Sequence, residues 1–145
     1  MPEVYRPGGW RALSDLLAGM DRVRFPNVRD WLAERADRVL GAWKEGNTDV
    51  ASILNNWHPE WVGEGDEVLS HEPSLADARL AVAREHGFAT WEAVEDAGAQ
   101  ALDPAFEEAV DLILAGDLQA VRERLEQTPA LVNQRSPFGH GATLL

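Results

Sequence analysis

Apolar residues recur along the chain at spacings of three and four, whereas the period-two alternation typical of strands is almost absent. This pattern predicts an all-α fold of six or seven helices. The first clear helix should begin after Asn27, a good N-cap, and end before Gly46. Its apolar stripe consists of Val28, Trp31, Leu32, Val39, Leu40 and Trp43.

The next segment predicts a short helix followed by a connection. Asp49 can cap a helix that carries Val50, Ile53, Leu54 and Trp57, and Pro59 ends it because proline restricts the residue before it. Residues 59–73 contain two Gly, two Pro and five acidic residues. They indicate a long exposed connection.

A central helix is predicted over residues 75–86. Ser74 and Asp77 match a capping box, and apolar residues occupy two faces of the helix, so both sides should touch protein. Gly87 suits the left-handed position after its last turn. Thr90 can cap the next helix, whose apolar face begins at Trp91.

The last third of the chain predicts two helices joined by a tight turn. Asp103-Pro104 combines an N-cap side chain with proline at the first helical position. Phe106, Ala109, Val110, Ile113 and Leu114 follow at helical spacing. Gly116-Asp117 then turns the chain into a second helix, which stops before Pro129.

The two Gly-to-Pro intervals have the same length. Gly46 to Pro59 and Gly116 to Pro129 each span 13 residues, at an offset of 70. Helix pairs of this size cannot bury their apolar faces alone, so stacking of repeated pairs is one expected arrangement. The alternative is a chance similarity between two ordinary helical hairpins.

Residues 109–145 resemble an ankyrin repeat followed by the opening of another. The motifs are Gly116-Asp117-Leu118 at the turn between helices, Leu131-Val132-Asn133 before the β-turn finger, and Thr143 and Leu145. The last two match the Thr and Leu of the family's Thr-Pro-Leu-His helix start, although Leu144 replaces the proline. The segments 75–91 and Ser136–His140 also resemble those of a group of bacterial ankyrin-repeat proteins.

The resemblance implies stacked helical hairpins, that is, an ankyrin-like α-solenoid fragment with an N-terminal helical cap. We expect an N-terminal extension at 1–27, a helical region at 28–102, and a capping repeat with the start of a second repeat at 103–145. Because Leu144 and Leu145 would lack a partner helix, we expect a fragment of a longer repeat protein. Its open end would also permit self-association.

Charge limits the classes of partner. The chain has 25 acidic and 13 basic residues, a net charge of −12, and residues 47–145 hold 18 of the acids against 5 basic residues. This balance disfavours nucleic acid and anionic membranes and leaves a basic protein partner open. The absence of cysteine and of a signal peptide fits a cytoplasmic protein.

Few residues carry recognisable chemistry. His58, Glu60, His71 and Glu72 surround the acidic connection, but no His pair has the spacing of a helical metal site, so we expect neither metal nor cofactor. No nucleophile motif or phosphate-binding loop occurs. The sequence therefore gives no sign of an enzyme.

Aromatic residues are the better binding candidates. Trp31, Trp43 and Trp57 follow helical stripes and should lie in the core. Trp61 stands in the polar connection, where it either packs against a helix or is presented to a partner.

The loop before the second repeat offers three further candidates. Arg135, Phe138 and His140 either contact a partner at a finger tip, as the resemblance implies, or only pack the turn.

The resemblance implies a non-enzymatic protein-interaction module, because ankyrin-like proteins bind other proteins. Two other functions remain open at this stage. One is a small acidic inhibitor or immunity-like protein that covers a basic enzyme or toxin surface. The other is a metal- or carboxylate-dependent hydrolase, which would require a cleft where His and acidic side chains converge.

Overall fold

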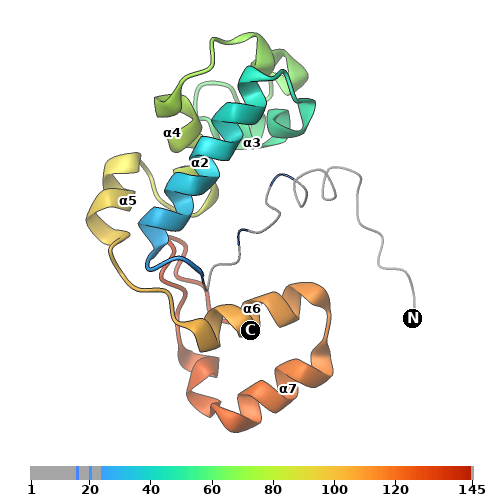
Figure 1. Ribbon diagram of the computed structural model, residues 1–145, viewed down its shortest axis with the longest axis vertical. Helices are drawn as coiled ribbons and strands as arrows, with labels where there is room; N and C mark the ends of the chain where they lie inside the picture. Colours follow the sequence, from blue (N-terminus) through green and yellow to red (C-terminus); the bar gives the residue numbers. More distant parts are fainter. Residues whose placement is uncertain (1–15, 17–19, 21–23, 145) are drawn as a thin grey trace.

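The computed structural model describes residues 16, 20 and 24–144, and this part of the chain is all-α, as predicted (Figure 1). The described chain contains no strand, and its one isolated β-bridge pairs Asn27 with Ala101. The elements in chain order are α2 (Val28–Lys44), the 3₁₀ helix η2 (Thr48–Val50), α3 (Ala51–Trp57), η3 (Gly65–Ser70), α4 (Leu75–Glu85), α5 (Trp91–Ala97), α6 (Pro104–Ala115), α7 (Leu118–Gln127) and η4 (Pro129–Asn133).

Four predicted helix starts are confirmed by side-chain caps. Asn27 Oδ1 accepts from the Asp30 amide at 2.8 Å, and Ser74 Oγ accepts from the Asp77 amide at 3.1 Å. Thr90 caps α5 and Asp103 caps α6 in the same manner. Each bond satisfies one amide that the first turn leaves without a partner, which is why these local signals are readable from sequence.

The repeated turn is also present. Gly46 and Gly116 have φ values of 70° and 75°, and each ends a helix with the paired backbone bonds of a Schellman motif. The residue after each glycine caps the following element: Asn47 Oδ1 accepts from the Asp49 amide, and Asp117 Oδ1 accepts from the Ala120 amide. The expected Asp49 cap is therefore wrong, because Asn47 takes that place and starts η2 before α3.

The repetition does not extend to packing. α6 packs against α7, whereas α2 packs chiefly against α4, and α3 packs against α4 and η3. The first of the two helical hairpins that the repeated spacing suggests, over residues 28–57, is therefore not a pair that packs mainly on itself. The physical reason is α4, whose Ala78, Ala81, Val82 and Ala83 are buried and let helices approach closely on two sides. Its predicted central place is confirmed.

An ion pair also joins α2 to α4. Arg35 is buried, and its Nε and Nη2 donate to the two Glu85 oxygens at 2.8 and 2.7 Å. This forked geometry matches the planar guanidinium to the carboxylate. It fixes the register between the two helices.

The connection over residues 59–73 is not wholly exposed, contrary to the prediction. It contains η3, which buries Val68, and it buries Trp61 to 9% exposure. The Trp61 indole lies between the parallel imidazoles of His58 and His71, with ring centroids 3.6 and 4.2 Å apart. Trp43 contacts its edge at 5.7 Å.

The two imidazoles of this stack hold the connection to its neighbours. His58 Nδ1 accepts from the Glu60 amide at 3.4 Å, so its Nε2–H donates to Asp77 Oδ1 at 3.0 Å. His71 Nε2 lies 2.7 Å from Glu64 Oε2. Both histidines therefore have structural roles, and the described residues hold no group of three or more His and acidic side chains that could bind a metal.

Tryptophan burial differs from the prediction at one of three helical positions. Trp31 and Trp43 are buried, as expected, but Trp57 is 41% exposed. It is the last residue of the short helix α3, and the chain turns away at Pro59, so its ring stays at the edge of the contact that buries Ile53 and Leu54.

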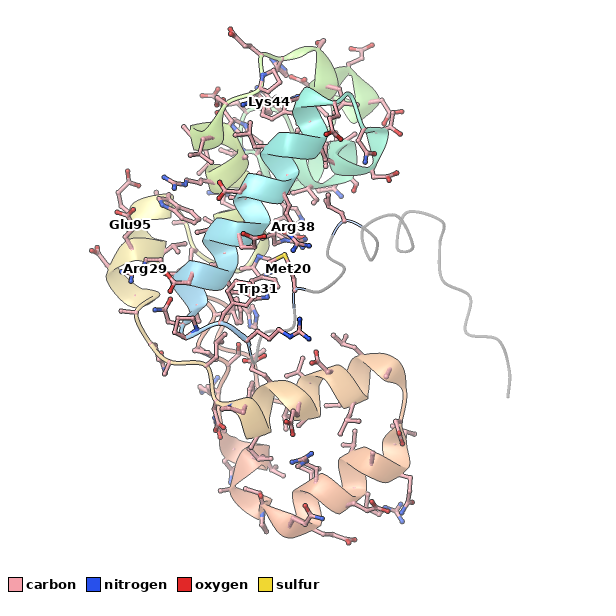
Figure 2. The ribbon with its side chains drawn as sticks, in the orientation of Figure 1. Met20, Arg29, Trp31, Arg38, Lys44 and Glu95 are labelled. Carbon is pink, nitrogen blue, oxygen red and sulfur yellow. The ribbon has the colours of Figure 1, made fainter. Side chains whose placement is uncertain are left out.

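The described residues of the predicted extension 1–27 contact α2. Trp31 Nε1 donates to the Met20 carbonyl at 3.0 Å, and Arg38 Nη1 donates to the Leu16 carbonyl at 3.3 Å (Figure 2). Met20 is buried in the larger of two hydrophobic clusters. The remainder of 1–23 lies outside the described residues.

The stack around Trp61 leads to a stability prediction. Replacing Trp61 with Ala should lower the free energy of unfolding by about 3–5 kcal/mol, because it removes a buried aromatic and leaves a cavity. Val62→Ala is the control, since Val62 is 66% exposed and should change stability by less than about 0.5 kcal/mol. Urea unfolding followed by circular dichroism measures both. Equal midpoints for Trp61→Ala and the unsubstituted protein would show that Trp61 is not a core residue.

Candidate functional site

Phe138 docks the C-terminal loop onto the N-terminal helices. Its ring is buried and lies edge-on to Trp31 at 5.5 Å and tilted against His86 at 5.4 Å. It belongs to the larger cluster, together with residues of α2 to α5, whereas α6 and η4 form a second cluster around Phe106, Ala109 and Leu131. Phe138 thus anchors the loop that follows η4 in the larger cluster, as Leu102 does just before α6.

The loop approaches α4 so closely that only glycine fits. A Cβ built on Gly139 would lie 2.4 Å from the Gly87 carbonyl oxygen, and one built on Gly87 would lie 2.2 Å from the His140 amide nitrogen. Gly87 also ends α4 with φ +84° in a Schellman motif, as predicted. Gly87 therefore both ends α4 and provides the backbone surface against which the loop packs.

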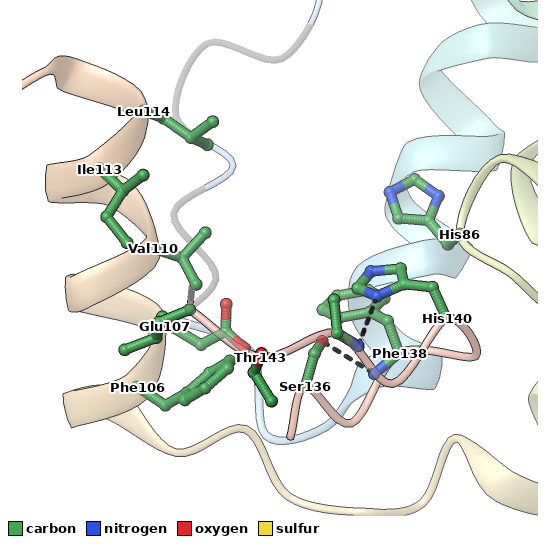
Figure 3. Close-up of a pocket in the computed structure, with 12 residues that line it drawn as sticks. His86, Phe106, Glu107, Val110, Ile113, Leu114, Ser136, Phe138, His140 and Thr143 are labelled. Atoms are coloured by element: carbon green, nitrogen blue, oxygen red, sulfur yellow. Dashed lines mark hydrogen bonds between the residues drawn. The ribbon is translucent and has the colours of Figure 1, made fainter. Parts of the chain in front are cut away.

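A pocket of about 210 Å³ opens between α6 and residues 136–144 (Figure 3). We call it the α6 groove. Figure 3 shows α6 along one side and the loop with His86 on the other. The groove is lined by His86, Phe106, Glu107, Val110, Ile113, Leu114, Ser136, Phe138, His140, Ala142, Thr143 and Leu144.

The α6 wall of the groove is mostly aliphatic. Val110 and Ile113 are half-buried, and Leu114 is 56% exposed. Next to this wall, Phe106 and Ala109 are buried in the second cluster, against which Val110 also packs. α6 is therefore apolar on more than the face that its own hairpin covers, which in a monomer typically marks a contact surface.

The polar lining serves mainly the turns of the loop. Ser136 Oγ accepts from the Phe138 amide at 3.2 Å, and His140 Nδ1 accepts from the Ala142 amide at 3.1 Å (Figure 3). On the same side of the groove, His86 Nδ1 donates to the Val82 carbonyl at 2.9 Å. These bonds hold the two histidine rings in fixed orientations.

Glu107 is the residue that sequence reasoning missed. The sequence analysis gives it no role, yet it is 1% exposed and lines the groove. The sequence does contain a signal for its position, because Glu107, Val110 and Leu114 have the i, i+3, i+7 spacing that places residues on one face of a helix. That face is the one that meets the groove.

The four predicted binding residues do not form one site. Phe138 and His140 both line the groove, with rings 6.1 Å apart and nearly parallel. Arg135 is exposed and donates from Nη1 to the Gly141 carbonyl at 3.0 Å, which closes the loop on itself. Trp61 lies in the separate stack between His58 and His71, so its burial favours the packing role.

Comparisons of the chain with models of protein families, with curated proteins and with solved structures find no match. The ankyrin resemblance therefore stays a prediction from the residues. Within the described part of the chain, every helix is too short or too polar to span a bilayer.

The close approach of the loop to α4 yields a prediction. Gly139→Ala should destabilise the protein by about 1–3 kcal/mol, because its methyl group would overlap the Gly87 backbone. Gly41→Ala is the matched control: no atom lies within 4 Å of its built Cβ, and alanine in a helix should stabilise by up to about 1 kcal/mol. Thermal unfolding measures both changes. A Gly139→Ala protein as stable as the unsubstituted protein would contradict the docked position of the loop.

Proposed function

We propose that this chain is a non-enzymatic protein-interaction module that holds a segment of a partner protein in the α6 groove. The observation that carries the proposal is the open aliphatic wall formed by Val110, Ile113 and Leu114. Burial of such side chains contributes about 25 cal/mol per Å² of apolar surface, which gives a partner a reason to bind there.

The groove has the rigidity that a binding site needs. Its loop side is held by Phe138 in the larger cluster and by the glycine contact with α4. Its α6 side is held by the second cluster and by the Arg124–Glu108 ion pair at 2.9 Å between α7 and α6. A preformed groove lowers the entropy cost of association.

The resemblance to ankyrin repeats supports the same proposal. In that family, the helix faces and the β-turn fingers contact other proteins, and the resemblance matches α6 and the loop 134–141 to those parts. We extend the proposal to an ankyrin-like capping unit of a cytoplasmic repeat protein.

An acidic mimic is less well supported by the surface. Exposed acidic side chains occur on α2, η3, α5, α6 and α7. An inhibitor that imitates an anionic ligand would need them gathered opposite one basic site.

A hydrolase is also less well supported. His86, His140 and Glu107 do line the groove, but the Nδ1 atoms of both rings are bonded to backbone groups, and the adjacent wall is aliphatic. We therefore favour binding over chemistry.

Site-specific crosslinking tests the proposed function. A photoreactive p-benzoylphenylalanine at position 114 should attach a discrete protein in the source cells, whereas the same group at exposed position 62 should not. The attached protein, once identified and purified, should bind the chain, and Leu114→Asp should weaken this binding by about tenfold or more.

Two results would contradict the proposal. One is crosslinking that is equal at positions 114 and 62. The other is binding of the purified partner that Leu114→Asp leaves unchanged.

A further inference from the structure

We propose that the occupant of the α6 groove is a basic amphipathic helix of the partner protein, an inference that rests on the proposed function. Three observations support this choice of occupant: the spacing of the apolar wall, the size of the pocket and the charge of the unit that carries it.

The apolar wall has the form of a strip. Val110, Ile113 and Leu114 line the groove at spacings of three and one residues along α6, and Leu118 begins α7 beyond the turn at Gly116. Leu114 and Leu118 are both more than half exposed. A helix laid along such a strip can present matching apolar residues at i, i+3, i+4 and i+7.

The size of the groove argues for anchoring side chains and against a small molecule. Pockets for drug-sized ligands have volumes of about 300–1,000 Å³. The α6 groove has about 210 Å³ and is open along α6. It fits one or two anchoring side chains of a longer segment that continues over the strip.

The charge of the unit selects a basic partner. Residues 103–144 hold seven acidic and three basic side chains, a net charge of −4. No Lys or Arg lines the groove, while Glu107 does. Arg124 pairs with Glu108, and Arg135 is bonded to its own loop. Lys or Arg on the polar face of a bound helix would therefore meet complementary charge, which speeds encounter.

The same charge argues against a second copy as the occupant. Each of two copies would bring the same acidic unit, residues 103–144 with a net charge of −4, to the contact. Like charges facing one another across an interface disfavour association. Self-association at this end is thus the weaker alternative.

Fluorescence anisotropy with a defined peptide tests the inference. The probe is a fluorescein-labelled helix of about 14 residues made of Leu and Lys, with Leu at i, i+3, i+4 and i+7. Two controls are a peptide with Glu in place of Lys and a peptide of scrambled Leu/Lys order. Leu114→Asp tests the groove, and Val62→Asp is its control because both side chains are exposed, at 56% and 66%.

We expect the ordered Leu/Lys peptide to bind more tightly than either control peptide. Leu114→Asp should weaken its binding by about tenfold or more, Val62→Asp should not, and raised salt should weaken it through screening. Circular dichroism checks that both variants keep the helical content and melting temperature of the unsubstituted protein.

Three outcomes would overturn the inference. Equal binding of the scrambled Leu/Lys peptide would indicate charge attraction alone. Tighter binding of the Leu/Glu peptide, itself sensitive to Leu114→Asp, would overturn the basic partner but leave the proposed function standing. If none of the peptides binds, the inference is overturned. The proposed function would still be tested independently by the crosslinking experiment.

Discussion

The packing of Phe138 against Trp31 and His86, which also contact each other, is the contact on which the rest of the structure depends. The cluster that holds α6, α7 and η4 together has only three fully buried side chains, and so small a core cannot stabilise a helix pair alone. Phe138 anchors the loop that follows η4 in the larger cluster of α2 to α5. The contact between Gly87 and Gly139 then fixes the distance at which the two parts meet, and with it the width of the groove.

Signals carried by neighbouring residues could be predicted from the sequence. The caps at Asn27, Ser74 and Asp103, and the glycine turns at Gly46 and Gly116, depend on bonds that span at most five residues. Their backbone needs are the same in any fold. The partner of α2 could not be predicted in this way, because the choice of α4 over α3 depends on which surfaces fit across a long stretch of chain.

The burial of single aromatic residues depends on such distant contacts too. Trp57 is exposed although its helical spacing indicates a core position. Trp61, for which the sequence leaves packing and presentation open, is buried because His58 and His71 enclose it. The groove could be predicted only in part. Phe138 and His140 were candidates, but its main wall is a face of α6 that meets them only after the loop docks on α4.

Proton NMR measures the central contact most directly. If Phe138 is seated as described, its ring protons show nuclear Overhauser effects to the indole protons of Trp31 and the imidazole protons of His86, whose ring centroids lie 5.5 and 5.4 Å away. Absence of these cross-peaks, with Phe138 ring shifts at their values in unfolded peptides, would contradict a docked loop and the groove that it forms.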